Sequence, residues 1–375
     1  MIQPPAQLSS LVTVDDYEVA ARERLTPMAY DYYRSGADEE HTLRRNRDAF
    51  ARYELWYRTM VDVSAPRVAT TVLGDDVAFP ILVAPTAYHR LACAEGERAT
   101  ARAAAELGSL YCASTLATTT LEDVASAAPD AARWFQLYVH KDRDFTARLL
   151  ARAKAAGYRA IVVTADTPVL GRRCADVRNG FCLPDGLVME NLVDALPPDL
   201  REGAGSELAR FVASRHDPAF VWSDLVAIAA QAAPLPVVVK GIARADDARR
   251  ALDHGARAVW VSNHGGRQLD LAPATIDALA EVVRAVGDRC EVYVDGGVRS
   301  GTHALVALAL GARAVFVGRP VLWGLAAAGA EGVSGVLTLL RDELVRAMQL
   351  AGCPDLESTR DDVVRRRLAS SGSFP

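Results

Sequence analysis

The segment Ala258-Val-Trp-Val-Ser-Asn-His-Gly-Gly-Arg-Gln-Leu-Asp270 runs from four apolar residues directly into a polar, glycine-containing turn. Such an apolar run, bounded by Gly255 and Pro273, is typical of a buried strand. In the turn, His264 can take a proton near neutral pH and Arg267 can grip a carboxylate with two hydrogen bonds. The alternative is a glycine turn with a solvated histidine and arginine. The combination of these groups at one strand end favours a functional site.

The pattern of a short apolar run followed by a helical stretch recurs from residue 79 onward. The apolar runs are 81–84, 110–113, 134–137, 160–164, 237–240, 258–261, 292–295 and 314–317. Helical composition between them is clearest at 97–107, 142–156, 243–254 and 302–310. Apolar strands alternating with helices predict a parallel sheet covered by helices. Eight such units predict a closed (β/α)8 TIM barrel in the α/β class, with a doubly wound open sheet as the alternative.

The 375 residues are expected to form one domain, because α/β barrels commonly reach this size. We expect an N-terminal helical segment over 1–78, helical from residue 13 to 52, the barrel over 79–350 and a tail over 351–375. Residues 167–221 form an unusually long interval after the fourth strand, rich in Pro, Gly, Asp and Arg. Loops of this length are usually active-site lids or disordered segments.

Composition excludes several classes of protein. The net charge of −5 without a basic block gives no electrostatic footprint for nucleic acid or anionic lipid. The six cysteines are scattered without CxxC or metal-ligand spacing, so we expect neither a disulfide framework nor a metal site. No uncharged apolar run reaches the roughly 18 residues of a membrane span, and no signal peptide is visible, so a cytoplasmic location is expected.

In a barrel, the reactive groups lie at the carboxyl ends of the strands, and polar residues follow every apolar run here. Lys240 ends an otherwise apolar strand, where an ammonium needs a negative partner or a depressed pKa. The alternative to a functional role for Lys240 is a salt bridge at the rim of the barrel. Asp166 could orient a catalytic imidazole, or simply cap the turn before Pro168.

The segment Asp295-Gly-Gly-Val-Arg-Ser-Gly301 opens a helix after the seventh strand. A glycine-bearing turn at a helix N-terminus offers backbone N–H groups to an anion, and barrels often bind phosphate after strands seven and eight. Arg299, together with Gly318 and Arg319 after the eighth strand, would add to such a site. The phosphate could belong equally to a substrate or to a cofactor.

The chain also resembles the FMN-dependent 2-hydroxy-acid oxidases, the family of glycolate, lactate and hydroxymandelate oxidases, from about residue 14 to the mid-350s. The most specific element is Ser262-Asn-His-Gly-Gly-Arg-Gln268. The other matching motifs are Tyr30-Asp-Tyr-Tyr-Arg-Ser-Gly-Ala37, Ala84-Pro-Thr-Ala87, Phe135-Gln-Leu-Tyr138, Val163-Thr-Ala-Asp-Thr-Pro168, Gly171-Arg-Arg173, Val239-Lys-Gly241, Asp295-Gly-Gly-Val-Arg299 and Gly318-Arg-Pro320.

The resemblance implies a role for each matching residue. It makes His264 the active-site base, supported by Asp166, with Tyr138 bonding the substrate. Arg173 and Arg267, aided by the Tyr32 hydroxyl, would bind the substrate carboxylate, and Leu116 would line the substrate pocket. Lys240 would stabilise negative charge on the reduced flavin. The flavin ring and ribityl chain would be lined by Pro85, Thr86, Ala87, Ser114, Gln136, Thr164 and Ser262, and the ribityl and phosphate would be held by Asp295, Gly296, Gly297, Arg299, Gly318 and Arg319.

The reaction implied by the resemblance is oxidation of an (S)-2-hydroxy acid to the 2-oxo acid, with electrons passing through FMN to O2 to give H2O2. Either hydride or carbanion transfer is compatible with these residues. Glycolate-specific relatives carry a tryptophan where this chain has Leu116, which favours medium-sized or aromatic acids such as mandelate or lactate. A flavin dehydrogenase with another acceptor and a non-catalytic flavin-binding barrel are the alternatives. The family also implies a homo-oligomer, commonly a tetramer.

Overall fold

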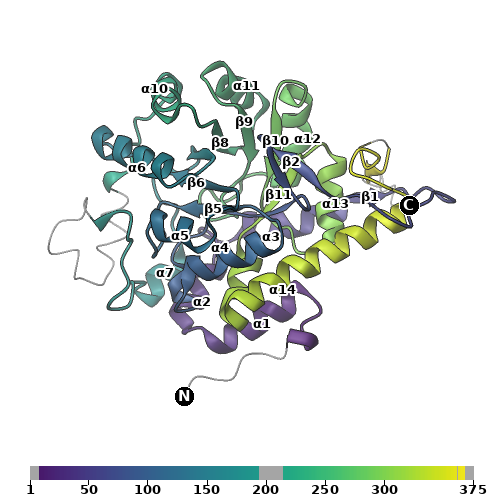
Figure 1. Ribbon diagram of the computed structural model, residues 1–375, viewed down its shortest axis with the longest axis horizontal. Coiled ribbons are helices and arrows are strands. Elements are labelled where there is room, and N and C mark those ends of the chain that lie inside the picture. Colours follow the sequence, from purple (N-terminus) through teal and green to yellow (C-terminus); the bar gives the residue numbers. More distant parts are fainter. Residues whose placement is uncertain (1–7, 194–213, 361, 368–375) are drawn as a thin grey trace, which may run out of the picture.

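The computed structural model describes residues 8–193, 214–360 and 362–367 of the chain, and at its centre is a closed barrel of parallel strands (Figure 1). The strands follow one another around the barrel in the order β10-β11-β4-β5-β6-β7-β8-β9. The predicted (β/α)8 barrel is therefore confirmed, and the open-sheet alternative is wrong. The strands are β4 (Ile81–Val83), β5 (Tyr111–Ser114), β6 (Arg133–Leu137), β7 (Ala160–Thr164), β8 (Val237–Ile242), β9 (Ala258–Val261), β10 (Glu291–Val294) and β11 (Ala314–Val317).

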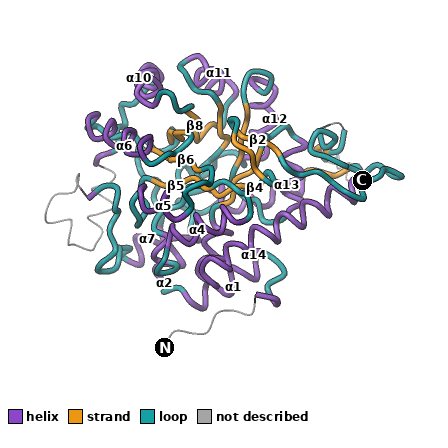
Figure 2. Tube along the Cα trace, in the orientation of Figure 1, coloured by secondary structure: helices purple, strands orange, loops and turns teal. Residues whose placement is uncertain are grey.

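Two apolar layers explain why these sequences close into a barrel. Aromatic side chains fill the inside, and the ring centroids of Trp260 and Phe316 lie 3.8 Å apart. The outer faces of the strands pack under helices, and Figure 2 shows the strands at the centre with helices around them. The covering helices are α4 (Gly96–Glu106), α5 (Leu121–Ala127), α6 (Arg143–Ala155), α10 (Trp222–Ala232), α11 (Ala245–Asp253), α12 (Thr275–Val286) and α13 (Gly301–Ala309).

The N-terminal segment is helical only in part. Thr13 begins α1 (Val14–Arg24) with a capping box to Asp16, and α2 (Pro27–Arg34) starts at a proline behind the Thr26 cap. α3 (His41–Asp48) continues into a 3-10 helix over Ala49–Arg52, after which the helical region ends. The region 13–52 that the sequence predicts to be helical thus consists of separate short helices, divided at the Thr26 cap and again between Ser35 and the left-handed Glu40.

Strands that the sequence analysis missed occupy the rest of this segment. β2 (Thr70–Val72) and β3 (Asp75–Val77) form an antiparallel hairpin, and Val72 and Val77 are buried within the cluster that fills the barrel interior. β1 (Tyr53–Leu55) pairs antiparallel with β12 (Val364–Arg366) from the C-terminal tail. The hairpin closes the amino-terminal end of the barrel.

The described part of the insertion after β7 carries α7 (Cys174–Asn179), which packs beside α2. The side-chain amide of Asn179 donates a hydrogen bond to the Asp31 carboxylate at 2.6 Å. The predicted lid or disordered segment falls partly on residues 194–213, outside the described ranges.

The last helix, α14 (Arg319–Ala351), has the length and apolar composition of a membrane span, but 61% of its most apolar window is buried inside the protein. Its backbone leaves the helical conformation at Ala328 and Gly329. A Cβ atom on Gly332 would lie 1.9 Å from the Gly324 carbonyl oxygen, whereas residues eight apart in a straight helix are about 12 Å apart. α14 is therefore two helices folded against each other, with glycines at their contact.

This contact predicts that Gly332→Ala lowers the free energy of unfolding by about 2–4 kcal/mol, because the added methyl group overlaps the Gly324 backbone. Denaturant unfolding of the purified protein would measure it. Glu331→Ala, at the exposed neighbouring position, serves as the control and should change the stability by less than about 0.5 kcal/mol. Equal stability of both variants would contradict the folded-back arrangement.

Candidate functional site

A cavity of about 490 Å³ opens at the carboxyl ends of the barrel strands. Of the side chains that the sequence predicted for the site, all but Asp166 and Ser262 line this cavity. Those two side chains lie behind the lining residues, where Asp166 is hydrogen-bonded to His264 and Ser262 to Lys240. Predicted residues on the wall are Tyr32, Pro85, Thr86, Ala87, Ser114, Leu116, Gln136, Tyr138, Thr164, Arg173, Lys240, His264, Arg267, Asp295, Gly296, Gly297, Arg299, Gly318 and Arg319.

His264 is held between a carboxylate and a phenol. Its Nδ1 lies 2.9 Å from Asp166 Oδ1, and its Nε2 lies 3.3 Å from the Tyr138 hydroxyl. Burial lowers the pKa of His264 below its ordinary value, although the Asp166 carboxylate opposes this shift. A neutral imidazole with Nδ1–H donated to Asp166 leaves Nε2 able to accept a proton from the cavity side.

The turn that carries His264 has an unusual backbone conformation. His264 itself has a left-handed φ of 58°, a conformation that is uncommon for a side chain other than glycine. Its N–H donates to Ser262 Oγ at 3.1 Å. At Gly266 a Cβ atom would lie 2.6 Å from the Leu43 backbone nitrogen, so only glycine lets the turn pack on α3.

Lys240 takes part in a buried polar cluster at the ends of β8, β9 and β10. Its Nζ donates to Ser262 Oγ at 3.0 Å and lies 3.5 Å from Asp295 Oδ2. Burial alone would lower the pKa of Lys240, but the carboxylates of Asp295 and Asp166 together make the net shift upward. The ammonium is therefore a fixed positive charge on the cavity wall.

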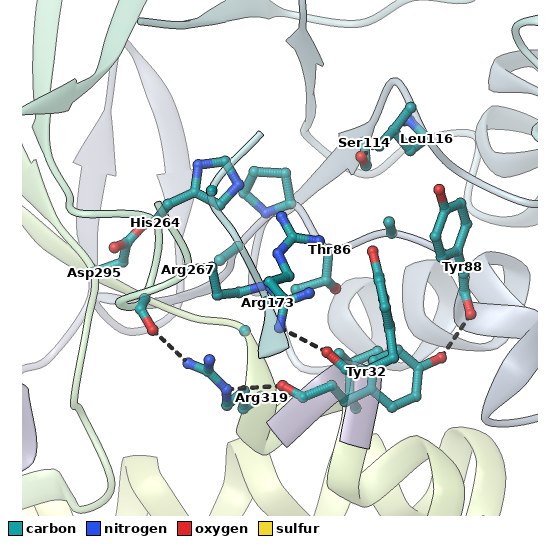
Figure 3. Close-up of a pocket in the computed structure, with 18 of the residues that line it drawn as sticks. Tyr32, Thr86, Tyr88, Ser114, Leu116, Arg173, His264, Arg267, Asp295 and Arg319 are labelled. Carbon is teal, nitrogen blue, oxygen red and sulfur yellow. Dashed lines mark hydrogen bonds between the residues drawn. The ribbon is translucent and has the colours of Figure 1, made fainter. Parts of the chain in front are cut away.

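The guanidinium groups of Arg173 and Arg267 lie 5.9 and 4.9 Å from the centroid of the Tyr32 ring. Nη1 of Arg267 donates to the carbonyl oxygens of Tyr32 and Ser35, which anchors one edge of its guanidinium. Burial and the charge of Arg173 lower the pKa of Arg267 to about 10. Figure 3 shows the two guanidinium groups close to His264 in the centre of the cavity. This pair offers donors to a carboxylate.

The predicted phosphate end of the cavity is also rich in buried positive charge. Burial lowers the pKa of Arg299 to about 10, and its buried Nε has no hydrogen-bond partner among the described residues. Gly296 and Gly297 have φ values of 99° and 81°, and a Cβ on Gly297 would lie 2.0 Å from the Asn46 carbonyl oxygen. An anionic phosphate fits this arrangement, because it would supply the missing negative charge and acceptors.

Arg319 lines the cavity, as the sequence predicted, and also forms hydrogen bonds that join two segments of the chain. Its guanidinium donates to the carbonyl oxygens of Tyr33, Gly265 and Ser35 at 2.9–3.0 Å. Burial and the neighbouring arginines hold the pKa of Arg319 well below its usual range. It thus ties the end of α2 to the turn that carries His264, while it also lines the cavity.

The opposite wall presents hydrogen-bonding amides and hydroxyls. Gln136 donates from Nε2 to Thr164 Oγ1 at 2.9 Å, and its Oε1 accepts from Ser114 Oγ at 3.2 Å. Buried, fully bonded polar groups of this kind fix their own orientation. They can therefore present defined donors and acceptors to a polar ring such as a flavin.

Sequence reasoning missed the aromatic lining beside Tyr32. Phe181, from the insertion, stacks on Tyr32 with centroids 4.2 Å apart, and Tyr88 lies 5.3 Å from Tyr32. Asp176 of α7 also borders the cavity. The sequence carries little signal for these residues, because Tyr88 and Phe181 lie in loops and Asp176 lies in a helix of only six residues.

A buried carboxylate supports the two loops that carry much of this wall. Glu97 is fully buried and accepts hydrogen bonds from the backbone of His89 and Thr118 and from the Thr119 hydroxyl. His89 in turn lies 2.6 Å from Thr86 Oγ1 through its Nε2. The loops after β4 and β5 are therefore fixed to each other from behind.

The geometry around His264 predicts that Asp166→Asn lowers the pKa of its imidazole further, because the carboxylate stabilises the protonated ring. The histidine resonances in an NMR pH titration would report the shift. Asp246→Asn, an exposed carboxylate at the start of α11, should leave the titration of His264 unchanged. A rise in the pKa of His264 in Asp166→Asn would contradict the assigned pairing.

Comparison with known proteins points to one family. The chain is 48% identical to 2-hydroxyacid oxidase 1 of Homo sapiens over 96% of this chain and 98% of that protein. It is 49% identical to an L-lactate oxidase of Nostoc sp., over 93% and 97% of the two chains, and 48% identical to glycolate oxidase 1 of Zea mays, over 95% and 96%. Among solved structures, a mandelate oxidase with (S)-4-hydroxymandelic acid superposes with a TM-score of 0.90 at 43% identity, over 96% of this chain and 100% of that one.

The sequence profile described as FMN-dependent dehydrogenase matches residues 21–366, nearly the whole chain. The buried arginines, the glycine-bearing turn after β10 and the cationic Lys240 fit the phosphate and the electron-rich ring of FMN. The chain therefore belongs to the FMN-dependent dehydrogenase family and is an FMN-containing oxidoreductase.

Proposed function

We propose that this protein oxidises an (S)-2-hydroxy acid to the corresponding 2-oxo acid and passes the electrons to O2, giving H2O2. One observation carries the proposal: an imidazole acceptor, a phenol donor and a pair of guanidinium groups meet in a single cavity. These are the groups needed to deprotonate an alcohol and to hold an adjacent carboxylate. FMN, when bound, supplies the two-electron acceptor.

His264 acts as the base in this proposal. Its Nε2 takes a proton from the substrate, and the positive charge that forms on the ring is stabilised by Asp166 at 2.9 Å. Tyr138 remains protonated, because burial raises the pKa of its hydroxyl above the usual range. It can therefore donate to the oxygen of the substrate while His264 accepts.

Arg173 and Arg267 bind the substrate carboxylate and orient the 2-carbon toward the base. Arg267 is already held by hydrogen bonds to two backbone carbonyl oxygens, so its side chain loses little conformational entropy when the carboxylate binds. Lys240, charged and buried on the wall, favours negative charge in the adjacent part of the cavity.

Medium-sized or aromatic side chains fit the substrate end better than the hydrogen atom of glycolate. That end is lined by Leu116, Tyr88 and Phe181, which offer apolar surface. Aromatic rings favour stacked or edge-on partners, which supports acids of the mandelate type. Relatives named mandelate oxidase and lactate oxidase are in accord with this preference.

The proposal is tested by a panel of glycolate, lactate, mandelate and a long-chain 2-hydroxy acid, with peroxide production and oxygen uptake measured together. We expect the highest kcat/KM for mandelate or another medium-sized acid, and one H2O2 for each O2 consumed. Rapid reduction of an artificial dye without oxygen uptake would instead identify a dehydrogenase. A purified protein whose flavin none of these acids reduces would overturn the proposal.

Leu116→Trp is the matched variant for the substrate preference. The larger side chain would fill the space beside the aromatic lining, so kcat/KM for mandelate should fall about 10- to 100-fold relative to glycolate. An unchanged ratio would show that Leu116 does not limit substrate size.

His264→Ala should retain bound FMN but reduce the rate of flavin reduction by a factor of about 10²–10⁴, because the proton acceptor is gone. Stopped-flow absorbance under anaerobic conditions would measure the rate. His254→Ala, at the end of α11 away from the cavity, should behave as the wild type. Near-normal flavin reduction in His264→Ala would contradict the role of the imidazole.

A further inference from the structure

Asp176 occupies an unexpected place for a carboxylate. It belongs to α7, borders the cavity, and only 17% of its side chain is exposed. Its Oδ2 lies 3.9 Å from Arg173 Nη1, too far for a hydrogen bond. Its Oδ1 is buried and has no hydrogen-bond partner among the described residues.

A carboxylate placed to position an arginine would normally form short, paired hydrogen bonds with it. Asp176 does not, and the Nε of Arg173 is likewise without a partner in the described part of the chain. The interaction between Asp176 and the arginines is therefore mainly one of charge. Burial raises the pKa of Asp176, while the charges of Arg267 and Arg173 oppose that rise.

We propose that Asp176 is the resident counter-ion of the Arg173–Arg267 pair and that it weakens binding of the substrate carboxylate. This inference rests on the proposed function, because it takes a carboxylate as the ligand of the arginine pair. Without a ligand, Asp176 partly balances two buried positive charges. An incoming carboxylate meets the same arginines and must share them with a negative charge already present.

The same competition would assist product release. Substrate and product both carry a carboxylate, so the arginine pair alone would hold the 2-oxo acid as firmly as the 2-hydroxy acid. The negative charge of Asp176, 3.9 Å from Arg173 Nη1, lowers the affinity of the arginine pair for substrate and for product alike. In a partly buried site such an effect is about tenfold. Asp176 thereby sets the balance between capture and release.

The test measures how the FMN-loaded enzyme binds phenylacetate, a carboxylate that lacks the hydroxyl group needed for oxidation. Titration of the flavin absorbance gives the dissociation constant. Asp176→Asn should bind phenylacetate about tenfold more tightly than the wild type, because the variant keeps the shape of the side chain and removes its charge. The inhibition constant of the 2-oxo acid product should fall by a similar factor.

Two controls distinguish the effect of the Asp176 charge from a structural effect of the substitution. Asp185→Asn removes one exposed carboxylate from the same insertion and should change the dissociation constant of phenylacetate less than twofold. Phenylacetamide, an uncharged analogue, should bind wild type and Asp176→Asn with the same affinity. Flavin content and thermal melting would establish that the variants are folded, and Asp176→Ala carries the same expectation if Asp176→Asn is unstable.

Unchanged or weaker binding of phenylacetate by Asp176→Asn and Asp176→Ala would overturn the inference. Weaker binding that Asp176→Glu restores would show instead that the carboxylate positions Arg173. A wild-type enzyme that binds phenylacetate but whose variants do not gain affinity refutes only the role of Asp176. A wild-type enzyme that binds no carboxylate at all refutes the proposed function as well.

Discussion

The need to keep several positive charges in one buried cavity constrains much of this structure. Burying a charge is costly unless a partner of opposite charge or strong hydrogen bonds compensate for it. Lys240 meets this need through Asp295, and Arg319 meets it through three backbone carbonyl oxygens. Arg299 and Arg173 each keep a buried Nε without a hydrogen-bond partner among the residues that the structure describes. Asp176 balances the arginine pair only in part, so the electrostatics of the cavity favour an anionic phosphate and a carboxylate as ligands.

The site stays ordered because the residues that line the cavity are held by a second set of residues behind them. Groups that touch the cavity are held by groups one layer behind it, as His264 is by Asp166 and Ser262. Glu97 acts in the same way for the loops after β4 and β5, although it never reaches the cavity. A hydrogen-bonded supporting layer of this kind helps to fix the geometry of the residues that line the cavity.

The sequence predicted the barrel because its strands are buried on both faces and are therefore continuous apolar runs such as 258–261. It predicted the cavity residues because parallel strands bring their carboxyl ends to one face, and family motifs named the roles. Elements without such a signal were missed. The β2–β3 hairpin is short and mixed in composition, the fold-back of α14 depends on a glycine contact between residues eight apart, and Phe181 lies in an irregular loop. Each is decided by tertiary contact rather than by local pattern.

The β2–β3 hairpin at the amino-terminal end of the barrel affects how substrate and product reach and leave the cavity. Val72 and Val77 seal that end, and the packed rings of Trp260 and Phe316 form a floor beneath the cavity. In the described part of the molecule the barrel interior is therefore filled at this end, and the cavity lies at the opposite, carboxyl-terminal end of the strands. Reactant and product do not pass along the barrel axis, so both must enter and leave from the carboxyl-terminal side. How quickly the cavity empties then matters as much as how quickly the bound acid reacts.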